Sequence, residues 1–300
     1  MIHIRVPATS ANMGPGFDSI GIAVELYNHI WVEEQTEGLT IEVKCKQAIP
    51  VPTDEKNLIY ETMKYFYDRK GLKMPGVRIV QEDHIPMVRG LGSSAACIVG
   101  GLFAANALAG NICDKDELAQ MAAQLEGHPD NSNPAIYGSM VVGAQDAEKM
   151  NYVRLELPDD LIFATMVPDF PVSTADARGV LPDSYTRKDM VFNASRTALL
   201  VASMMTGKYE NFDMAMEDCV HQPYRAQLIP GMHEIFKHAK EFGAVASYLS
   251  GAGSTLMAMV TKDRAEEFER KMSAYLGTLE HNWELNLLKA DMQGVLVETE

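Results

Sequence analysis

The residues from Pro86 to Ala96, PMVRGLGSSAA, have the types and spacing that most clearly indicate chemistry. The stretch places Gly90, Gly92, Ser93 and Ser94 just ahead of a long run of small and apolar residues. This order predicts a glycine-rich loop followed by a buried helix. The first N–H groups of a helix lack partners and carry the positive end of its dipole, so they favour phosphate, which glycine lets approach closely. The serine hydroxyls can cap the helix, contact phosphate oxygens or reach a metal ion.

Two other interpretations of this stretch stay open. The small residues could serve only to let a helix pack tightly. Residues 90–95 also satisfy G-x-G-x-x-A, a fingerprint of dinucleotide-binding folds, although no clean apolar strand runs straight into them and no βαβ unit is evident nearby. The commoner phosphate loop, G-x-x-x-x-G-K-[ST], does not occur in the sequence.

Two further segments rich in glycine and small polar residues lie far away in the sequence. One is PATSANMGPGFDSIG, residues 7–21, and the other is SGAGST, residues 250–255. These residue types favour turns with special backbone angles, so both segments are predicted to be loops. The glycine turn in the second segment is expected to comprise Ser250, Gly251, Gly253 and Ser254. Because all three segments adjoin buried-looking stretches, we expect them to meet at one ligand.

The rest of the chain reads as alternating strands and helices. Apolar alternation predicts strands at 2–6, 22–32, 39–45, 77–81, 139–143, 152–157, 161–167, 244–249, 255–260 and 293–298. Helical spacing predicts helices at 57–70, 116–126, 134–137, 191–206, 212–219, 231–242 and 263–276. We place a domain boundary after residue 157, which gives an N-terminal domain, 1–157, and a C-terminal domain, 158–300.

The composition limits the classes of function. The chain has 300 residues, of which 47% are hydrophobic and 22% charged, as is typical of one large or two ordinary globular domains. Its net charge of −15 disfavours the broad basic surface that nucleic acids and anionic membranes require, so neither is an expected partner. A few arginines could still make a local anion pocket. The four cysteines show no metal-ligand spacing, and no signal peptide is evident, so we expect a cytoplasmic protein.

Four short sequence motifs together resemble those of a known family. ATSANMGPGFD, PMVRGLGSSAA, EGHPDN at residues 126–131, and SGAGST resemble the GHMP small-molecule kinases over essentially the whole chain. The resemblance implies an α+β fold of two domains, the N-terminal one like domain 2 of ribosomal protein S5 and the C-terminal one ferredoxin-like. The first and third motifs are closest to the branch that acts on L-homoserine. That branch transfers phosphate from ATP to the side-chain hydroxyl, giving O-phospho-L-homoserine for threonine biosynthesis, and family habit suggests a homodimer.

The resemblance also implies the residues that bind ATP and magnesium. The ATP site comprises Pro86, Met87, Val88, Arg89, Gly90, Leu91, Gly92, Ser93, Ser94, Ala95 and Ala96. Mg²⁺ takes oxygen ligands and keeps several waters. Ser93 or Ser94 together with Glu126 resembles the family's pair of Mg²⁺ ligands. Taken alone, Glu126 could equally be a solvated helix end.

The substrate implied by the resemblance is a zwitterion. Its ammonium requires an oxygen acceptor, and its carboxylate is best bound by arginine. The matching family positions are Asn12, Asp18, His128, Asp130 and Asn131, with Arg178 and Arg225 as the carboxylate-binding arginines. Structural roles stay open for Asp18, for His128 and for either arginine.

The general base is the least settled part of this chemistry. Mevalonate-type members use an aspartate where the homoserine branch has an asparagine, which here is Asn131. A loose phosphoryl-transfer transition state needs little early deprotonation, so positioning can carry most of the catalysis. The chain departs from the family pattern just after this residue, where Ser132 and Asn133 replace small or apolar residues, as in DNVAP. We expect these two polar groups to alter the substrate pocket.

Two other functions stay open at this point. The chain could be a family member that acts on another small alcohol such as mevalonate, although the two arginines favour an amino acid. It could also be a non-catalytic nucleotide-binding or S5-like RNA-binding module. The negative charge opposes RNA binding, and the presence of Ser93, Ser94 and Glu126 opposes a dead site.

Overall fold

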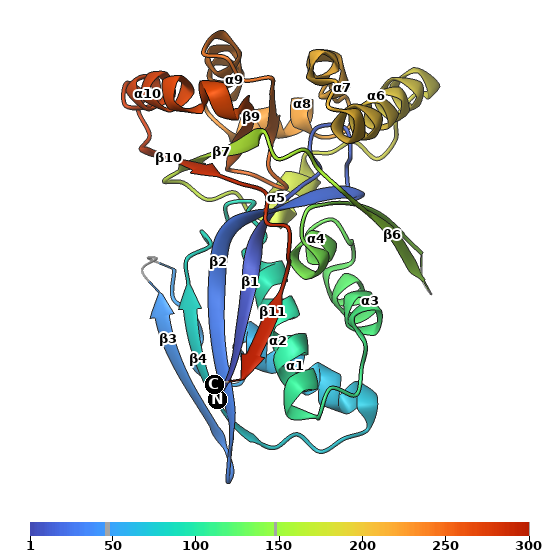
Figure 1. Ribbon diagram of the computed structural model, residues 1–300, viewed down its shortest axis with the longest axis vertical. Coiled ribbons are helices and arrows are strands. Elements are labelled where there is room, and N and C mark those ends of the chain that lie inside the picture. Colours follow the sequence, from blue (N-terminus) through green and yellow to red (C-terminus); the bar gives the residue numbers. More distant parts are fainter. Residues whose placement is uncertain (46–48, 147–148, 300) are drawn as a thin grey trace.

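The computed structural model describes residues 1–45, 49–146 and 149–299, and these residues form two sheets with helices packed against each (Figure 1). The first sheet has the order β11–β1–β2–β4–β3, and β5 branches from β2 and pairs with β6. Its strands are β1 (Ile2–Ala11), β2 (Ile20–Gln35), β3 (Leu39–Cys45), β4 (Gly76–Asp83), β5 (Met140–Gln145), β6 (Met150–Leu155) and β11 (Leu296–Thr299). The second sheet has the order β10–β7–β9–β8 and is antiparallel throughout. Its strands are β10 (Trp283–Leu288), β7 (Leu161–Pro168), β9 (Leu256–Thr261) and β8 (Ala246–Leu249).

A buried central helix organises the first half of the chain. The helices that pack on the first sheet are α1 (Leu58–Lys70), α2 (Ser93–Leu108), α3 (Lys115–Glu126) and α4 (Ser132–Tyr137). Helix α2 contacts α1, α3, α4 and β1, and its buried residues are mostly alanine, glycine and aliphatic. Because the other elements surround it, this helix is apolar on nearly every side. The buried helix predicted after the glycine loop is therefore confirmed.

Helices of the second half fall into two groups in Figure 1. Helices α9 (Met232–Glu241) and α10 (Ala265–Leu276) cover the second sheet through a core that includes Ile235, Phe268 and Met272. Helices α6 (Arg187–Thr206) and α7 (Phe212–Ala215) pack on each other and form the second group, while the short helices α5 (Thr174–Gly179) and α8 (Gln222–Arg225) lie between the two groups and the first sheet. The side chains of Asn193 and Thr197 on α6 donate to the carbonyl of Pro15, so this group contacts the loop between β1 and β2.

The structure corrects several expected elements. Strand β1 continues to Ala11 across a bulge, so residues 7–11 are strand and not loop, and only the segment from Asn12 onward turns. The expected helix 212–219 ends at Ala215. Strand β10 and helices α5 and α8 are absent from the expectations. The two short helices have too few residues to show a helical period, whereas alternating Trp283, Leu285 and Leu287 did carry a strand signal.

Strand membership bears on the predicted boundary between domains. The chain leaves the first sheet after Leu155 and enters the second at Leu161, on either side of the division placed after residue 157. The last strand, β11, then returns and pairs with β1, so both termini lie at the same end of the first sheet (Figure 1). Residues from the end of the predicted C-terminal domain thus complete the N-terminal sheet. Within the described ranges, no helix is long and apolar enough to cross a lipid bilayer.

Candidate active site

The three glycine-rich segments meet at one cavity of about 620 Å³. Hydrogen bonds tie them together. The Ser250 hydroxyl donates to the carbonyl of Gly90 (2.6 Å), the amide of Gly251 donates to the carbonyl of Ala11 (3.1 Å), and the Asn12 side chain donates to the carbonyl of Gly251 (3.0 Å). The predicted convergence of segments far apart in the sequence is therefore confirmed.

The glycine-rich loop before α2, residues 86–92, which we call the phosphate loop for its predicted role, presents backbone N–H groups to this cavity together with the first turn of the helix. Helix α2 starts at Ser93 with Gly92 as its N-cap, has no side-chain cap, and has no acidic residue in its first turn. Its first N–H groups and the positive end of its dipole are thus open to an anion. Gly90 and Gly92 have φ of +76° and +70°. A Cβ would lie 2.2 Å from the carbonyl oxygen of Ser250 at the first glycine and 2.0 Å from Thr9 Oγ1 at the second, so both positions require glycine.

Some residues that the resemblance assigned to ATP have their side chains elsewhere. Leu91 and Ala96 do not line the cavity, because both are buried in the core. Arg89 lines it, but its guanidinium donates to the carbonyls of Pro168 (3.0 Å) and Asp169 (2.9 Å), which anchors the loop to the end of β7. The rest of the stretch lines the cavity: Pro86, Met87, Val88, Gly90, Gly92, Ser93, Ser94 and Ala95.

The glycine turn supports the cavity more than it lines it. Gly251 and Gly253 reach the cavity, whereas Ser250 and Ser254 do not. The two serines are fully buried and donate to the carbonyls of Gly90 and Phe170, both at 2.6 Å. They hold the turn against the phosphate loop.

Glu126 suits a cation. It ends α3, lines the cavity, and has a buried Oε2 with no hydrogen-bond partner among the described residues. Burial raises the pKa of its carboxyl group to about 8, although the positive charge of His128 acts in the opposite direction. An unpartnered buried carboxyl oxygen is costly unless a cation satisfies it. Since Ser93 and Ser94 line the same cavity, these oxygen donors fit Mg²⁺.

A histidine between carboxylates lies next to Glu126. His128 Nδ1 is 2.5 Å from Oδ1 of Asp130, whose side chain is buried. Burial alone would lower the pKa of His128, but the hydrogen bond to Asp130 and the charges of Asp130, Glu126 and Asp18 outweigh it and raise the pKa to about 9. Ligand atoms of Asp18, His128 and Asp130 all lie within 4.8 Å of one another. His128 is therefore an imidazolium at neutral pH, and it offsets part of the acidic charge.

Both predicted arginines line the cavity, but they differ in burial and in their hydrogen-bond partners. Arg178 makes a two-pronged ion pair with Asp18 at 2.9 and 3.1 Å, and both residues are partly exposed. Arg225 is buried and donates to the carbonyls of Ala177 (3.0 Å) and Gly251 (2.8 Å). Burial, and then the nearby charge of Arg178, lower the pKa of Arg225 to about 10, so it stays charged at neutral pH. Its Nη2 has no partner in the described part of the chain.

The two asparagines line the cavity with their side chains already engaged. Asn12, at φ +71°, accepts from the amide of Asp18 (3.0 Å), so it shapes the loop that carries that aspartate. The Oδ1 of Asn131 accepts from the Thr9 hydroxyl at 2.9 Å. Ser132 and Asn133 are fully buried and do not line the cavity. Neither side chain reaches the cavity itself, although Ser132 faces the carboxyl group of Glu126, which does line it, so the expected effect on the substrate pocket stays a prediction.

The sequence analysis missed the stretch Val172–Thr174 at the start of α5 and a larger part of the cavity wall. This larger part combines apolar Val51, Leu58 and Ile98 with polar Lys56, Asn57, Gln81, Asp83 and Cys97. The Asn57 amide donates to Gln81, whose amide donates to Asp83 at 2.8 Å, and burial raises the pKa of that carboxyl group. The available signal was the pairing of an N-cap asparagine before LIYETM with polar residues at the end of β4.

The dinucleotide interpretation of the glycine loop is wrong. A dinucleotide fingerprint requires a parallel strand after the helix that follows the loop. Here the chain passes from α2 through α3 and α4 to β5, which pairs antiparallel with β2. The parallel neighbours β3 and β4, joined through α1, precede the loop instead.

Comparisons with known proteins agree with this architecture. The family model for the GHMP kinases N terminal domain matches residues 57–139, and the GHMP kinases C terminal model matches residues 197–278. A homoserine kinase of Clostridium novyi is 46% identical over 98% of each chain. One of Clostridium botulinum is 43% identical over 99% of this chain and 98% of the relative.

Solved structures resemble the whole chain. The homoserine kinase of Cytophaga hutchinsonii superposes with a TM-score of 0.90 at 28% identity, covering 99% of this chain and 97% of that one. A putative homoserine kinase of Listeria monocytogenes gives 0.82 at 33% identity, with both chains fully covered. A mevalonate kinase, at 14% identity and a TM-score of 0.72 over 97% of this chain and 99% of that one, shares the fold. With its glycine loop at the start of a buried helix, its two-domain α+β architecture and these matches over nearly its full length, the chain belongs to the GHMP kinase family.

Proposed function

We propose that the protein has homoserine kinase activity, transferring the terminal phosphoryl group of ATP to the side-chain hydroxyl of L-homoserine for threonine biosynthesis. The observation that carries the proposal is one cavity that holds both a phosphate-binding helix terminus and paired charges for a zwitterion. The near-full-length relatives named for this activity support it. The reaction yields ADP and O-phospho-L-homoserine.

The phosphate loop is the proposed ATP site. The N–H groups from Gly90 to Ala95 would bind the phosphates, and the apolar wall around Leu58 and Ile98 would take the nucleoside. Ser93 or Ser94 with Glu126 would hold Mg²⁺, which supplies positive charge to the transferring phosphoryl group when bound. Electrostatic support of this kind is the main requirement of phosphoryl transfer.

Charged side chains at the other part of the cavity would fix homoserine. Arg225 offers an unpartnered Nη2 to the substrate carboxylate, and Arg178 would exchange part of its bond to Asp18 for the same group. The substrate ammonium would then be received by the carboxylates of Asp18 and Asp130. The zwitterion would thus replace one ion pair, Arg178 with Asp18, by two complementary ones.

No general base is assigned among these residues. His128 is already protonated at neutral pH, and Asp130 is engaged by it at 2.5 Å. Asn131, fixed by Thr9, would orient the hydroxyl through its amide nitrogen, which has no partner among the described residues. The hydroxyl proton would leave late, to the transferred phosphoryl group or to solvent, as a loose transition state allows.

A mevalonate activity has less support. Mevalonate has a carboxylate but no ammonium, so it would compete with Asp18 for Arg178 and bring no cation to take the place of that arginine. The solved mevalonate kinase is only 14% identical, and its likeness shows the fold alone.

The deciding experiment measures ADP release from Mg-ATP with L-homoserine, L-serine, L-threonine or mevalonate. Release with homoserine well above the other alcohols is expected. Release with mevalonate alone would retain the ATP site but refute the roles of Arg178 and Arg225. Absence of release with all four, despite ATP binding, would refute the proposed activity.

We also propose that the protein is a cytoplasmic homodimer that associates through the outer face of α6. Met190 and Met205 are 61% and 59% exposed there, and exposed Ala194, Ala198 and Ala202 lie between them. This stripe is nearly symmetric about Ala198, so a second copy packed antiparallel would set methionine ends beside small residues. The same pairing brings the basic start of the helix, RK at 187–188, toward exposed Glu210 of the other copy, whereas Asp213 nearby is already paired with Lys240.

Sedimentation of the wild type and an Ala198→Glu variant tests this surface. A dimer that the substitution converts to monomer is expected, while Ser195→Glu, exposed but off the stripe, stays dimeric. A monomeric wild type, or a dimer indifferent to Ala198→Glu, would refute the surface. The cytoplasmic assignment accords with free thiols at Cys97, Cys113 and Cys219; the side chain of Cys45 lies outside the described residues.

A further inference from the structure

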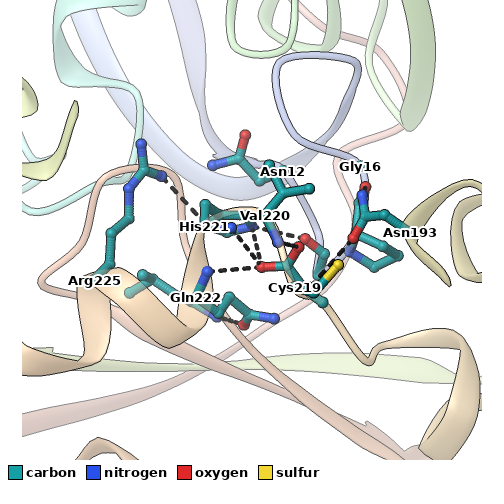
Figure 2. Close-up of polar contacts among 12 residues, drawn as sticks. Asn12, Gly16, Asn193, Cys219, Val220, His221, Gln222 and Arg225 are labelled. Atoms are coloured by element: carbon teal, nitrogen blue, oxygen red, sulfur yellow. Dashed lines mark hydrogen bonds and ion pairs between the residues drawn. The ribbon is translucent and has the colours of Figure 1, made fainter. Parts of the chain in front are cut away.

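Arg225 is contacted from behind by a fully buried histidine, His221 (Figure 2). Nδ1 of His221 is 3.4 Å from Nη1 of Arg225, and Nε2 is 2.7 Å from the carbonyl oxygen of Gly14. The histidine does not line the cavity. It therefore touches two elements of the substrate site from the protein side.

The two contacts define which nitrogen of His221 carries the proton. The carbonyl of Gly14 can only accept, so Nε2 donates to it and the Nδ1 lone pair faces the Arg225 guanidinium. Burial lowers the pKa of His221, and the charge of Arg225 lowers it further, although Asp218 opposes both. The ring is consequently neutral at neutral pH and can accept from Arg225.

Asp218 fixes the backbone that carries the histidine. Its buried carboxylate accepts from the amides of Val220 (2.8 Å), His221 (3.0 Å) and Gln222 (2.7 Å). Figure 2 shows these bonds converging on one carboxylate at the start of α8. Because the amides at this helix start are already satisfied, the segment from 219 to 225 has little freedom to move.

The loop on the other side of His221 needs external support. Asn12 and Met13 have φ of +71° and +44°, a left-handed conformation that costs free energy in residues other than glycine. Surrounding contacts must hold such a loop in place. His221 supplies two of them, its bond to the carbonyl of Gly14 and the stacking of its ring on Phe17. Further contacts are the bonds from α6 to the carbonyl of Pro15 and from Asn12 to the carbonyl of Gly251. The same loop carries Asp18, the proposed acceptor for the substrate ammonium.

We propose that His221 is a positioning residue that fixes both ends of the bound zwitterion, holding Arg225 with Nδ1 and the Asp18 loop with Nε2–H. This inference rests on the proposed function, because it takes homoserine as the ligand. In this proposal, His221 sets the distance between the group that binds the substrate carboxylate and the group that binds its ammonium. His221 itself touches neither substrate nor phosphate.

Two conservative variants separate the two contacts. In His221→Asn, the side-chain oxygen can stand where Nδ1 lies, so the link to Arg225 survives and the link to Gly14 is lost. In His221→Gln, the longer amide can reach Gly14, while the acceptor for Arg225 is lost. His233→Gln, on the exposed side of α9, is the control.

Analogues that lack one charged group report on each end of the ligand. 4-Hydroxybutanoate has only the carboxylate, and 3-aminopropan-1-ol has only the ammonium. Calorimetric binding of each to the wild type and the variants, with Mg-ATP affinity and unfolding temperature measured alongside, needs no turnover. His221→Gln is expected to weaken the carboxylate analogue about tenfold and to leave the amine analogue within about twofold, and His221→Asn is expected to do the reverse.

The outcomes distinguish this inference from the proposed function. Equal losses of affinity for both analogues in both variants, or no loss in either variant, would overturn the positioning role. Equal losses together with a lower unfolding temperature would show that His221 has a structural role only. In an Arg225→Lys background, His221→Gln should add little further loss for the carboxylate analogue, since the contact it removes is already disturbed. A wild type that binds both analogues but does not phosphorylate homoserine would refute the proposed function alone.

Discussion

The two parts of the cavity are built in contrasting ways. The phosphate side is made from the backbone of one continuous segment, Gly90–Ala95, and the N-terminus of α2. The substrate side is made from charged side chains that four separate segments supply: Asp18, His128 with Asp130, Arg178 and Arg225. In the proposed function, the first part would bind by dipoles and close approach, and the second by paired charges.

This difference determines how each part can fail. A site made of backbone N–H groups loses affinity when an added Cβ displaces the loop, because all of these groups move together. A charge-paired site fails one partner at a time, and a lost partner leaves the other buried without compensation. Substitutions in the two parts should therefore change the kinetic constants for ATP and for homoserine to different extents.

The largest effect is expected from Gly90→Ala. Its Cβ would meet the carbonyl oxygen of Ser250 at 2.2 Å, so the loop and the glycine turn must separate. Displacing several phosphate-binding N–H groups should lower kcat/KM for ATP about a thousandfold. Steady-state kinetics and ATP calorimetry provide the measurement.

Gly110→Ala is the matched control for this change. Gly110 also has positive φ (+86°), but a Cβ there meets nothing within 4 Å. It should show the cost of the backbone conformation on stability without a loss of ATP binding. Similar ATP kinetics in both variants would contradict the close-approach argument.

A smaller and more selective effect is expected from Asp130→Ala. Removal of the carboxylate takes away the partner that holds His128 charged and one proposed acceptor for the substrate ammonium. KM for homoserine should rise about 10- to 100-fold, with kcat and KM for ATP nearly unchanged. A collapse of kcat measured at saturating homoserine would instead identify Asp130 as the general base.

The contiguous part of the site was accessible from the sequence for a physical reason. An anion-binding loop made of backbone N–H groups needs glycines and small residues at adjacent positions. Gly90, Gly92 and Ser93 therefore form a short motif that can be recognised in the sequence. The turn at Gly251 and Gly253 can be recognised in the same way. These local motifs predicted that the three segments converge, and the cavity confirms it.

The dispersed part could not be derived from spacing alone. A charge at position 178 or 225 could face solvent, and only a family resemblance brought both arginines to one ligand. The direction of a side chain also depends on neighbours far away in the sequence: Leu91 and Ala96 turn into the core, and Ser132 and Asn133 do so within the second motif. The buried partner of Arg225, His221, gave no local signal at all.

Glu126 provides a way to measure Mg²⁺ binding separately from the binding of the phosphates and of the substrate. Its folded-state pKa of about 8 is above the ordinary value of 4.5, so the group is mostly protonated at pH 7. Since a carboxylate must lose its proton to bind Mg²⁺, Mg-ATP binding at pH 7 should release about one proton. Calorimetry in buffers of different ionisation enthalpy measures it, and Glu126→Gln should abolish the release.

The pH dependence of stability follows with a definite sign. A carboxyl group with a raised pKa makes the folded state less stable as pH rises from about 4.5 through about 8. His128, whose pKa is also raised, adds stability that is complete below about 6.5 and lost through about 9. Without Mg²⁺, the free energy of unfolding should therefore fall between pH 6.5 and 9, and Glu126→Gln should lessen that fall. A free energy of unfolding that rises in this range would contradict both assignments.

The smallest effect is expected where the chain departs from its family. Ser132 and Asn133 are fully buried; the Ser132 hydroxyl faces the Glu126 carboxyl group, whereas the Asn133 Oδ1 has no partner among the residues that the structure describes. Asn133→Ala, which follows the family pattern at that position, removes this unsatisfied oxygen and should raise the free energy of unfolding by about 1 kcal/mol, whereas Ser132→Val would also remove a group that faces Glu126 and is expected to give no gain. KM for homoserine should stay within about twofold in Asn133→Ala, because Asn133 does not line the cavity. Chemical denaturation and steady-state kinetics measure the two quantities, and a large change in KM without a change in stability would return Asn133 to the substrate pocket.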